Sequence, residues 1–181
     1  MSPLELLAIA VWVMLPAYVP NNAAVLAGGG RPIDGGRTLG DRRILGDGKT
    51  WRGTILGTLV GVALAYLLNL LRPTVVSFLG ISFPVFPLAV MIALPLGAML
   101  GDIVASFLKR RMGRKRGAAL PGLDQLDFAV VALALSAAVA PGWFLSVFTV
   151  GLLIVILVVT PILHVVTNVL AYLFGLKHEP W

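Results

Sequence analysis

The chain has 181 residues, of which 59% are hydrophobic and only 12% are charged, and its mean hydropathy is +0.97. This composition is too apolar for an ordinary soluble domain and predicts an integral membrane protein. The absence of cysteine excludes disulfides, thiolate nucleophiles and Cys-ligated metal centres. The net charge of +6 would suggest nucleic acid in a soluble protein. In a membrane protein the placement of the charges matters more than their sum, and we expect no nucleic-acid partner.

The basic residues gather in two places. Six of the 14 Lys and Arg residues lie between Arg31 and Arg52, and six more lie between Lys109 and Arg116. Short loops rich in Lys and Arg stay on the cytoplasmic side of a membrane. We therefore expect two cytoplasmic loops, residues 27–50 and 112–122, within a single transmembrane domain that covers residues 1–181. A functional site would then face the cytoplasm from the plasma membrane.

The first half of the chain predicts two spanning helices and an irregular connection. Residues 4–26 are long and apolar enough to span a bilayer, although two prolines and an Asn pair interrupt them. A second helix is predicted over residues 51–71, ended by Arg72-Pro73. Residues 73–87 are apolar but contain Ser, Gly and Pro, which indicates an outer connection or an irregular dip into the bilayer.

The second half predicts helices over residues 88–111 and 123–139, with Pro141-Gly142 ending the latter. The last apolar stretch, residues 143–174, has 32 residues, or about 48 Å as a helix, whereas a hydrocarbon core is about 30 Å thick. We expect a kink at Pro161. The predicted fold is all-α and polytopic, with about five transmembrane helices, the N-terminus outside and the C-terminus cytoplasmic. A break at Pro161 into two crossings would make six.

Polar and small residues mark faces of these predicted helices. Thr160, His164 and Asn168 recur every four residues and would form a polar stripe, in which His164 is interpreted as a packing residue. Small residues recur every four residues on two other helices, where they allow backbones to approach closely. They indicate packing within the chain, and a homodimer seam is the alternative. The small residues are Gly53, Gly57, Gly61 and Ala65 on one helix, and Ala93, Gly97, Gly101 and Ala105 on the other.

Asp102 stands inside an apolar helix, where a carboxylate costs at least about 2.5 kcal/mol. It should therefore face water or the protein interior and have a partner. Ser106, Lys109 and Arg110 follow at four, seven and eight residues, which places them on the same helix face. We favour a functional role over a buried ion pair with Lys109 or another cation. An ion or phosphate transporter or channel that uses Asp102 is the alternative function.

Asp124 and Asp127 lie at the start of the helix predicted over residues 123–139. Each alone fits a capping role, with Asp124 as the N-cap and Asp127 at the third helical position of a capping box. Together with Asp102, however, they place three carboxylates at the cytosolic ends of neighbouring helices, beside twelve cations. Carboxylates that hold Mg²⁺, next to Lys and Arg that neutralise phosphates, suit a phosphate-bearing substrate.

The first basic loop ends in ILGDGKTWRG, which suggests a Walker A motif. Arg43 stands where that motif requires its first Gly, and no strand is predicted before it, so the P-loop interpretation fails. The segment instead places Lys49, Thr50 and Arg52 just before a helix whose first amide groups could receive a phosphate.

Two motifs resemble a known family. The pattern S-x-x-K-R at residues 106–110 and P-G-x-D-Q-x-D at residues 121–127 are similar to the signature of the CTP-dependent phosphatidate cytidylyltransferases. The loop GRPIDGGRTLGDRRILGDGKTWRG, residues 30–53, resembles the archaeal branch of that family, the CDP-archaeol synthases. Together with the helix count, the resemblance covers nearly the whole chain.

The resemblance implies a reaction in which CTP and an isoprenoid lipid phosphate, 2,3-di-O-geranylgeranylglyceryl phosphate, give CDP-archaeol and pyrophosphate with Mg²⁺ as cofactor. The phosphate of the lipid is already a nucleophile, so no catalytic Ser or Cys is needed. We assign Asp102, Asp124 and Asp127 to metal binding and catalysis, and Lys109 to catalysis at the phosphates. The residues assigned to binding CTP or the lipid headgroup are Arg43, Lys49, Thr50, Arg52, Ser106 and Arg110.

Overall fold

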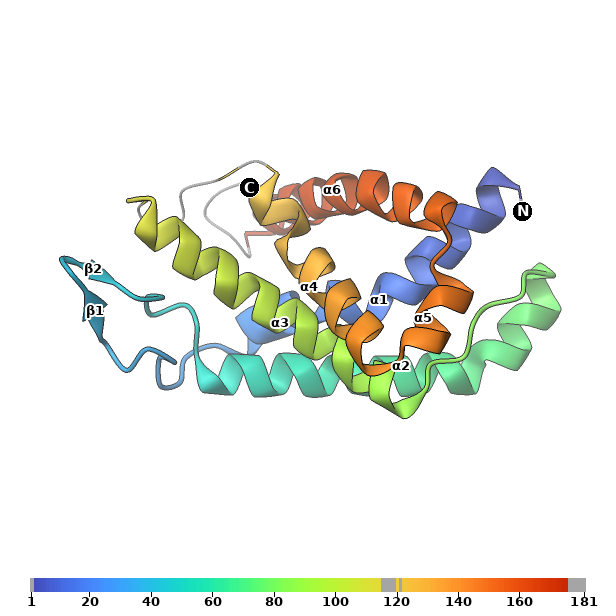
Figure 1. The fold of residues 1–181 in the computed structure, drawn as a ribbon, viewed down its shortest axis with the longest axis horizontal. Helices are drawn as coiled ribbons and strands as arrows, with labels where there is room; N and C mark the ends of the chain where they lie inside the picture. The colour runs from blue at the N-terminus through green and yellow to red at the C-terminus, as the bar shows by residue number, and fades with distance from the viewer. Residues whose placement is uncertain (1, 115–119, 121, 176–181) are drawn as a thin grey trace.

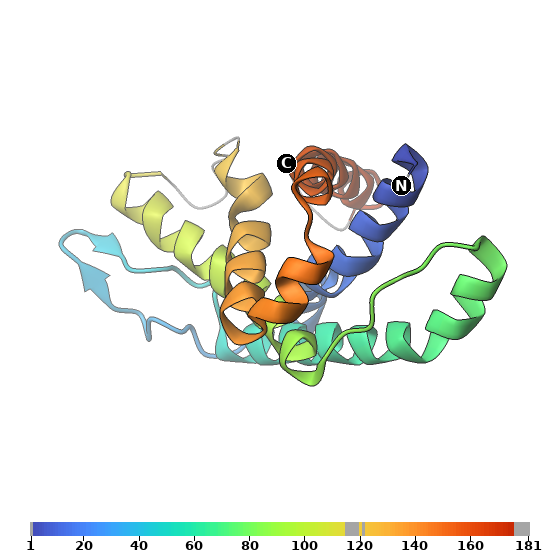
Figure 2. The ribbon, with the colours of Figure 1, turned by 45° about the vertical axis from the view of Figure 1, so that its right-hand side comes forward.

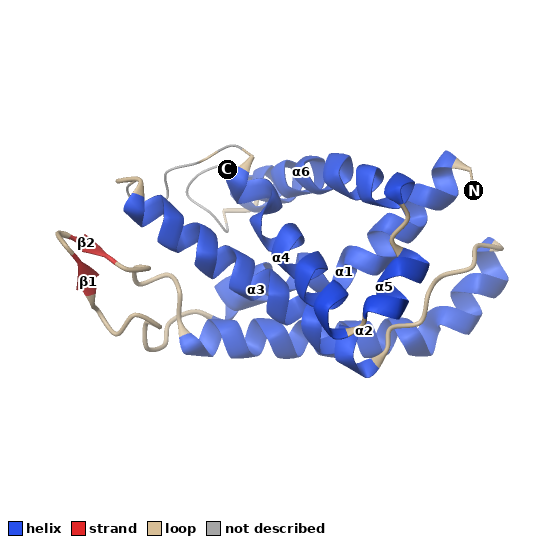
Figure 3. Ribbon diagram, in the orientation of Figure 1, coloured by secondary structure: helices blue, strands red, loops and turns tan. Residues whose placement is uncertain are grey.

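The computed structural model describes residues 2–114, 120 and 122–175. The expectations for Lys115, Arg116, Lys177 and His178 lie outside these residues. The described chain is mainly helical (Figures 1 and 3), which confirms the all-α prediction. Loop 1, residues 28–50, adds one short antiparallel hairpin. The elements are α1 (Pro3–Ala27), β1 (Thr38–Leu39), β2 (Arg42–Arg43), α2 (Trp51–Leu79), α3 (Leu88–Arg111), α4 (Leu123–Val139), α5 (Pro141–Val147) and α6 (Val150–Leu173).

Four of the described helices, α1, α2, α3 and α6, are long and apolar enough to cross a membrane. The multi-pass character predicted from the sequence is therefore confirmed. The helix α4 has 17 residues, or about 26 Å at 1.5 Å per residue, and it packs along α3. The count of five spans and their orientation stay predictions.

The helices form one bundle in which α1, α2 and α3 pack against one another, α4 lies on α3, and α6 contacts α1 and α4. Figures 1 and 2 show the hairpin of loop 1 and the C-terminal end of α3 at one end of the molecule. The N-terminus and the connection between α2 and α3 lie at the other end. The described residues of both basic clusters thus lie at the end that carries loop 1.

The small residues of α2 and α3 are used for packing inside the chain. A Cβ atom at Gly61 would lie 2.3 Å from Pro95 Cβ and 2.7 Å from the carbonyl oxygen of Pro16, so α1, α2 and α3 meet at this glycine. A Cβ atom at Gly101 would lie 2.5 Å from the carbonyl oxygen of Asp127 on α4. Close backbone approach of this kind requires small residues. These faces are therefore not a homodimer seam, and the in-chain interpretation is correct.

The predicted end of the second helix at Arg72-Pro73 is wrong, because α2 continues through Pro73 to Leu79. A proline removes only its own N–H from the helical ladder, and a helix survives this loss where neighbouring groups hold its backbone. Gly80, at φ +69°, ends the helix instead.

The connection between α2 and α3, residues 80–87, is irregular as predicted, and side chains satisfy its backbone. Asn69 on α2 donates to the carbonyl oxygen of Phe86 at 2.8 Å and accepts from its N–H at 2.9 Å. Arg72 Nε donates to the carbonyl of Phe83 at 2.5 Å, and Trp143 Nε1 donates to that of Val85 at 2.7 Å. Backbone without regular structure needs such partners where water is scarce.

The last apolar run is broken earlier than predicted. It divides at residues 148–149 into α5 and α6, and α6 continues past Pro161 to Leu173. Thr149 starts α6 as its N-cap, since its hydroxyl accepts a hydrogen bond from Leu152 N at 3.2 Å. The run is therefore divided at Thr149, and the alternative of a break at Pro161 into two crossings does not occur.

Candidate active site

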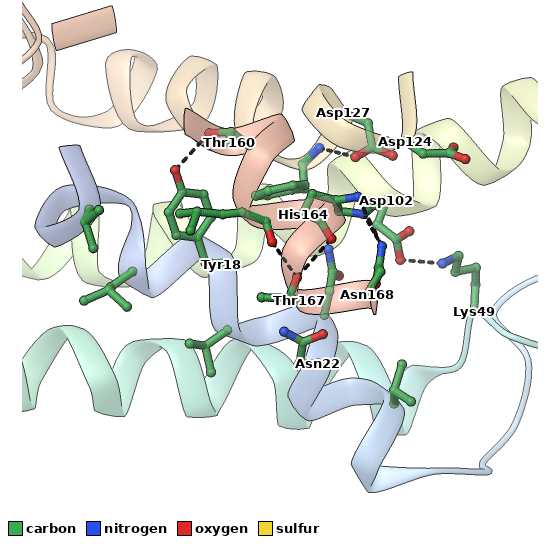
Figure 4. Close-up of a pocket in the computed structure, with 17 residues that line it drawn as sticks. Tyr18, Asn22, Lys49, Asp102, Asp124, Asp127, Thr160, His164, Thr167 and Asn168 are labelled. Carbon is green, nitrogen blue, oxygen red and sulfur yellow. Dashed lines mark hydrogen bonds and ion pairs between the residues drawn. The ribbon is translucent and has the colours of Figure 1, made fainter. Parts of the chain in front are cut away.

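The structure brings the three predicted acids together. Asp102 on α3 and Asp124 and Asp127 on α4 line one cavity of about 500 Å³ (Figure 4). The contact between Gly101 and the backbone of Asp127 holds these two helices together beside the acids. The volume lies within the range of about 300–1,000 Å³ that is usual for small-molecule sites. We call this cavity the acidic cavity.

Two of the acids form ion pairs with lysines. Lys49 of loop 1 contacts Asp102 through Nζ and Oδ2, as Figure 4 shows. Lys109 Nζ lies 2.7 Å from Asp124 Oδ1. The alternative considered for Asp102 from the sequence, an ion pair with Lys109 or another cation, is thus found with Lys49 of loop 1, whereas Lys109 pairs with Asp124. The charges of the acidic cavity are partly balanced by cations from two different segments.

A second pocket, of about 280 Å³, adjoins this cavity and is strongly basic. Loop 1 and the last turns of α3 form its walls. Lys49 lines both pockets, and Lys109 connects them through its ion pair with Asp124. Five of the residues predicted to bind substrate or take part in catalysis converge in this basic pocket: Arg43, Lys49, Ser106, Lys109 and Arg110.

Thr50 and Arg52 line neither of these two pockets. The hydroxyl of Thr50 is the N-cap of α2 and accepts a hydrogen bond from Gly53 N at 3.1 Å. Arg52 is exposed, one residue into the helix. The predicted role of Arg52 in phosphate binding therefore gains no support from its placement. Thr50 lines a smaller pocket of about 70 Å³ that it shares with Lys49 and Asp102.

The capping interpretation of Asp124 and Asp127 is wrong. Gly122 is the N-cap of α4 and makes no side-chain cap. Asp124 Oδ2 instead accepts from Leu120 N at 2.8 Å, and Asp127 lies one turn further along the helix. Gly122, at φ +87°, lets the helix begin before either carboxylate reaches a capping position. Both side chains consequently line the cavity.

Sequence reasoning missed several polar residues of the acidic cavity. Tyr18 on α1 and Thr160 on α6 contribute a hydroxyl pair 2.8 Å apart. His164 and Asn168 line the same cavity from α6 (Figure 4), so the predicted polar stripe faces the acids. The spacing of the stripe indicated a polar environment. It did not indicate that the stripe and the acids line the same cavity, because they are far apart in the sequence.

Asp34 was also missed, and it organises loop 1. Its buried carboxylate accepts hydrogen bonds from the N–H groups of Gly36, Leu45 and Gly46 at 3.1, 3.0 and 2.9 Å. Arg43 donates to it through Nε at 3.2 Å and through Nη2 at 2.8 Å. The Arg43 guanidinium, aided by these amides, holds the pKa of Asp34 well below its ordinary value. Asp34 therefore sets the position of Arg43 in the basic pocket.

Hydrogen bonds also join loop 1 to the C-terminal end of α3. Arg111 donates to the carbonyl oxygens of Leu39 at 2.7 Å, Arg42 at 3.3 Å and Arg43 at 2.8 Å. Arg42 Nη1 donates in return to the carbonyl of Arg111 at 3.1 Å. These contacts close the basic pocket between two segments that are far apart in the sequence.

The donor types in the acidic cavity fit Mg²⁺, which prefers hard oxygen ligands. Besides the three carboxylates, the buried Oδ1 of Asn21 lines the cavity and has no hydrogen-bond partner among the described residues. In the part of the chain that the structure describes, no three acid or His side chains already form a ligand set. A metal would thus require the lysines to release Asp102 and Asp124.

The fold and the two pockets define a multi-pass helical membrane protein in which an acidic cavity adjoins a basic pocket. The chain matches the CarS-like family model, described as CDP-archaeol synthase, over residues 3–181, and it belongs to this family. It is 65% identical to the CDP-archaeol synthase of Natronomonas pharaonis, with 98% of each chain covered. It is 50% identical to that of Methanosarcina barkeri, with 93% of this chain and 100% of the relative covered.

A solved structure is similar over most of the chain. It is described as an intramembrane enzyme for archaeal membrane lipid biosynthesis. The TM-score is 0.72 at 40% sequence identity, and the match covers 88% of this chain and 92% of that one. The fold described above is therefore that of an intramembrane enzyme.

Proposed function

We propose that this protein transfers CMP from CTP to the phosphate of 2,3-di-O-geranylgeranylglyceryl phosphate, giving CDP-archaeol and pyrophosphate, at the cytoplasmic face of the plasma membrane. The family and the curated relatives support cytidylyl transfer over the transporter alternative. The observation that carries the proposal is the pairing of an acidic cavity with a basic pocket through Lys49 and Lys109.

The reaction needs positioning and charge neutralisation more than proton transfer. An oxygen of the lipid phosphate attacks the α-phosphorus of CTP, and the bond from that phosphorus to the oxygen bridging to the β-phosphorus breaks. The electron pair leaves with pyrophosphate. Because the attacking oxygen is already anionic, the protein has to align two polyanions and offset their repulsion.

The basic pocket suits the triphosphate of CTP. Arg43, Lys109 and Arg110 line it together with the hydroxyl of Ser106, and these groups can donate charge-assisted hydrogen bonds to phosphate oxygens. Lys49 and Lys109 now contact carboxylates. We infer that they exchange these carboxylates for phosphate oxygens when the nucleotide binds.

That exchange leaves Asp102, Asp124 and Asp127 to hold Mg²⁺. The bound ion would neutralise phosphate charge and polarise the α-phosphate. Asn21 Oδ1 lies on the same cavity wall as an additional oxygen donor. The protein's contribution is to keep these oxygens next to the basic pocket on α1, α3 and α4.

The acidic cavity also has an apolar side that suits the lipid. Val11, Leu15 and Val19 of α1 and Leu163 of α6 line it beside Phe128 of α4. Isoprenoid chains could lie along these residues while the phosphate reaches the acids. The choice of an isoprenoid ether is supported by the family, since an apolar wall accepts any hydrocarbon tail.

The test is formation of labelled CDP-lipid from CTP and the lipid phosphate by the purified protein in detergent with Mg²⁺. Asp124→Asn and Asp127→Asn are each expected to lower kcat by about 100-fold or more, as for loss of other preorganised electrostatic groups. Asp41→Asn, an exposed change at the tip of the hairpin, is the matched control and should retain full activity. Near wild-type turnover of both cavity variants would show that these acids do not hold the metal.

A further inference from the structure

A separate pocket lies towards the end of the molecule opposite loop 1. It has a volume of about 320 Å³ and is formed by the C-terminal part of α2, the connection between α2 and α3, the end of α5 and the start of α6, with Ile9 of α1. Figure 1 shows these segments together at the end where the N-terminus lies. Its polar lining residues are Arg72, Ser82, Ser146 and Thr149, and it shares no lining residue with the acidic cavity or the basic pocket.

Arg72 is an unusual residue at this end. Twelve of the other 13 Lys and Arg residues belong to the two basic clusters, and a charge placed in or near lipid is costly without a partner. Within the described ranges, no carboxylate forms an ion pair with Arg72. Glu5, the one acid described at this end, accepts a hydrogen bond from Ser2 N at 2.9 Å.

The guanidinium of Arg72 has N–H donors that no described residue accepts from. Its Nε donates to the carbonyl oxygen of Phe83 at 2.5 Å, which fixes the plane of the group. Its two terminal amino groups make no hydrogen bond to another described residue. A guanidinium held in this way presents a fork of N–H groups that matches two oxygens of one phosphate or carboxylate.

The surroundings of Arg72 also favour an anion that is attached to lipid. Ser82 is exposed and makes no hydrogen bond to the described residues, and α6 begins at Thr149 on the pocket wall, where the helix dipole is positive. Large exposed apolar side chains adjoin the lining residues Ser146 and Thr149 in the chain, since Leu145 and Val150 are exposed at 76% and 75%. In a membrane such side chains contact acyl or isoprenoid chains.

We propose that this pocket binds the phosphate of a lipid headgroup in the leaflet opposite the candidate active site, with Arg72 as the main ligand and Ser82 beside it. The bound lipid would link α2, the connection and α6, and so stabilise the bundle. A free phosphate ion has the same chemistry, and the experiment separates the two sources. This proposal does not depend on the proposed function.

The test measures the melting temperature of the whole protein in nanodiscs of a phosphate-free glycolipid, with and without added phosphatidylglycerol, and separately with inorganic phosphate. For the wild type we expect phosphatidylglycerol to raise Tm by roughly 2–4 °C more than in Ser82→Glu, which places a negative charge at the pocket mouth. Ser77→Glu, exposed on α2 and outside the pocket lining, is the matched control for added charge. Arg72→Gln should lose the same increment and keeps a donor for the carbonyl of Phe83.

All variants keep loop 1, so any increase in Tm that comes from general attraction of anionic lipid to loop 1 cancels when the variants are compared. An increment lost in Ser82→Glu and Arg72→Gln but kept in Ser77→Glu supports a lipid phosphate site. An equal increment from inorganic phosphate, lost in the same two variants, supports the anion site with free phosphate as its ligand. Equal increments in all four proteins, or none in the wild type, overturn the proposal.

Discussion

Asp34 shows how one buried carboxylate determines the shape of a loop that has little regular structure. It gathers three amide groups and Arg43 from residues up to twelve positions away. The same guanidinium also contacts Asp47, at 2.9 Å. Because Arg43 lines the basic pocket, the loop conformation and the electrostatics of the site depend on the same contacts.

We predict that Asp34→Asn raises KM for CTP by about 10-fold, with a smaller effect on kcat. The amide keeps the shape of the side chain but loses the charge-assisted bonds to Arg43, which are roughly twice as strong as neutral ones. Steady-state kinetics with CTP as the varied substrate measures this effect, and Asp41→Asn in the same loop is the control. A fall in kcat with unchanged KM would contradict a role for Asp34 in positioning the nucleotide ligands.

The depressed pKa of Asp34 predicts the pH range in which loop 1 stays assembled. A carboxyl whose pKa is lowered on folding stabilises the folded form above its unfolded pKa of about 3.9, and this contribution is lost as pH falls towards the folded value. Hydrogen-exchange protection of the Leu45 and Gly46 amides should therefore persist from pH 7 to pH 5, once intrinsic exchange rates are corrected. Loss of protection near pH 6 would contradict it.

At the scale of the elements, the contact between α3 and α4 at Gly101 controls the distance between the acids. Asp102 is the next residue along α3, and the glycine packs on the backbone of Asp127 and Phe128. Any side chain there would have to push α4 away from α3. The geometry of the acidic cavity thus depends on a residue that itself carries no functional group.

We predict that Gly101→Ala destabilises the protein by about 1–3 kcal/mol, the usual cost of overpacking, and lowers kcat by more than 10-fold because Asp102 and Asp127 are displaced. The matched control is Gly151→Ala in α6, where a Cβ atom would meet nothing within 4 Å. That change should leave activity unchanged. Thermal unfolding and turnover of both variants check the prediction, and equal behaviour of the two would refute it.

At the scale of the whole molecule, the two ends differ in chemistry. Loop 1, the end of α3 and the basic pocket that they form lie at one end, whereas Arg72, in the C-terminal part of α2, lies towards the other end, apart from both basic clusters. Short basic loops remain in the cytoplasm. The arrangement therefore supports the predicted orientation with loop 1 inside and the connection between α2 and α3 outside.

This orientation can be tested by thiol labelling, since the chain has no cysteine of its own. Asp41→Cys in the hairpin should react with an impermeant maleimide only in inside-out vesicles. Gly80→Cys, at the end of α2, should react only when the outer face is accessible. Unmodified protein provides the background. Labelling of both positions from one side would disprove the orientation.

Much of the fold was predictable, because the hydrophobic effect acts on local composition. The bounds of α3 and α4 matched the prediction, since apolar runs end there in a basic cluster or a proline. The course of the chain through Pro73 was not predictable, because the connection that follows supplies the partners of Asn69 and Arg72. The break at Thr149 was missed although its N-cap is a local feature, because the run of apolar residues continues on both sides of it.

By itself, the sequence determined that the protein lies in the membrane and that most of its cations gather in two basic clusters. It also predicted Asp102, Asp124 and Asp127 as residues of one site, and their role in the chemistry stays a prediction. Only the tertiary structure decided that Lys49 pairs with Asp102, that Asp34 holds Arg43, and that the polar stripe of α6 faces the acids. The physical reason is the separation along the chain over which each effect acts. Composition and helical periodicity act over a few residues, whereas ion pairs and close backbone contacts join segments that only the folded bundle brings together.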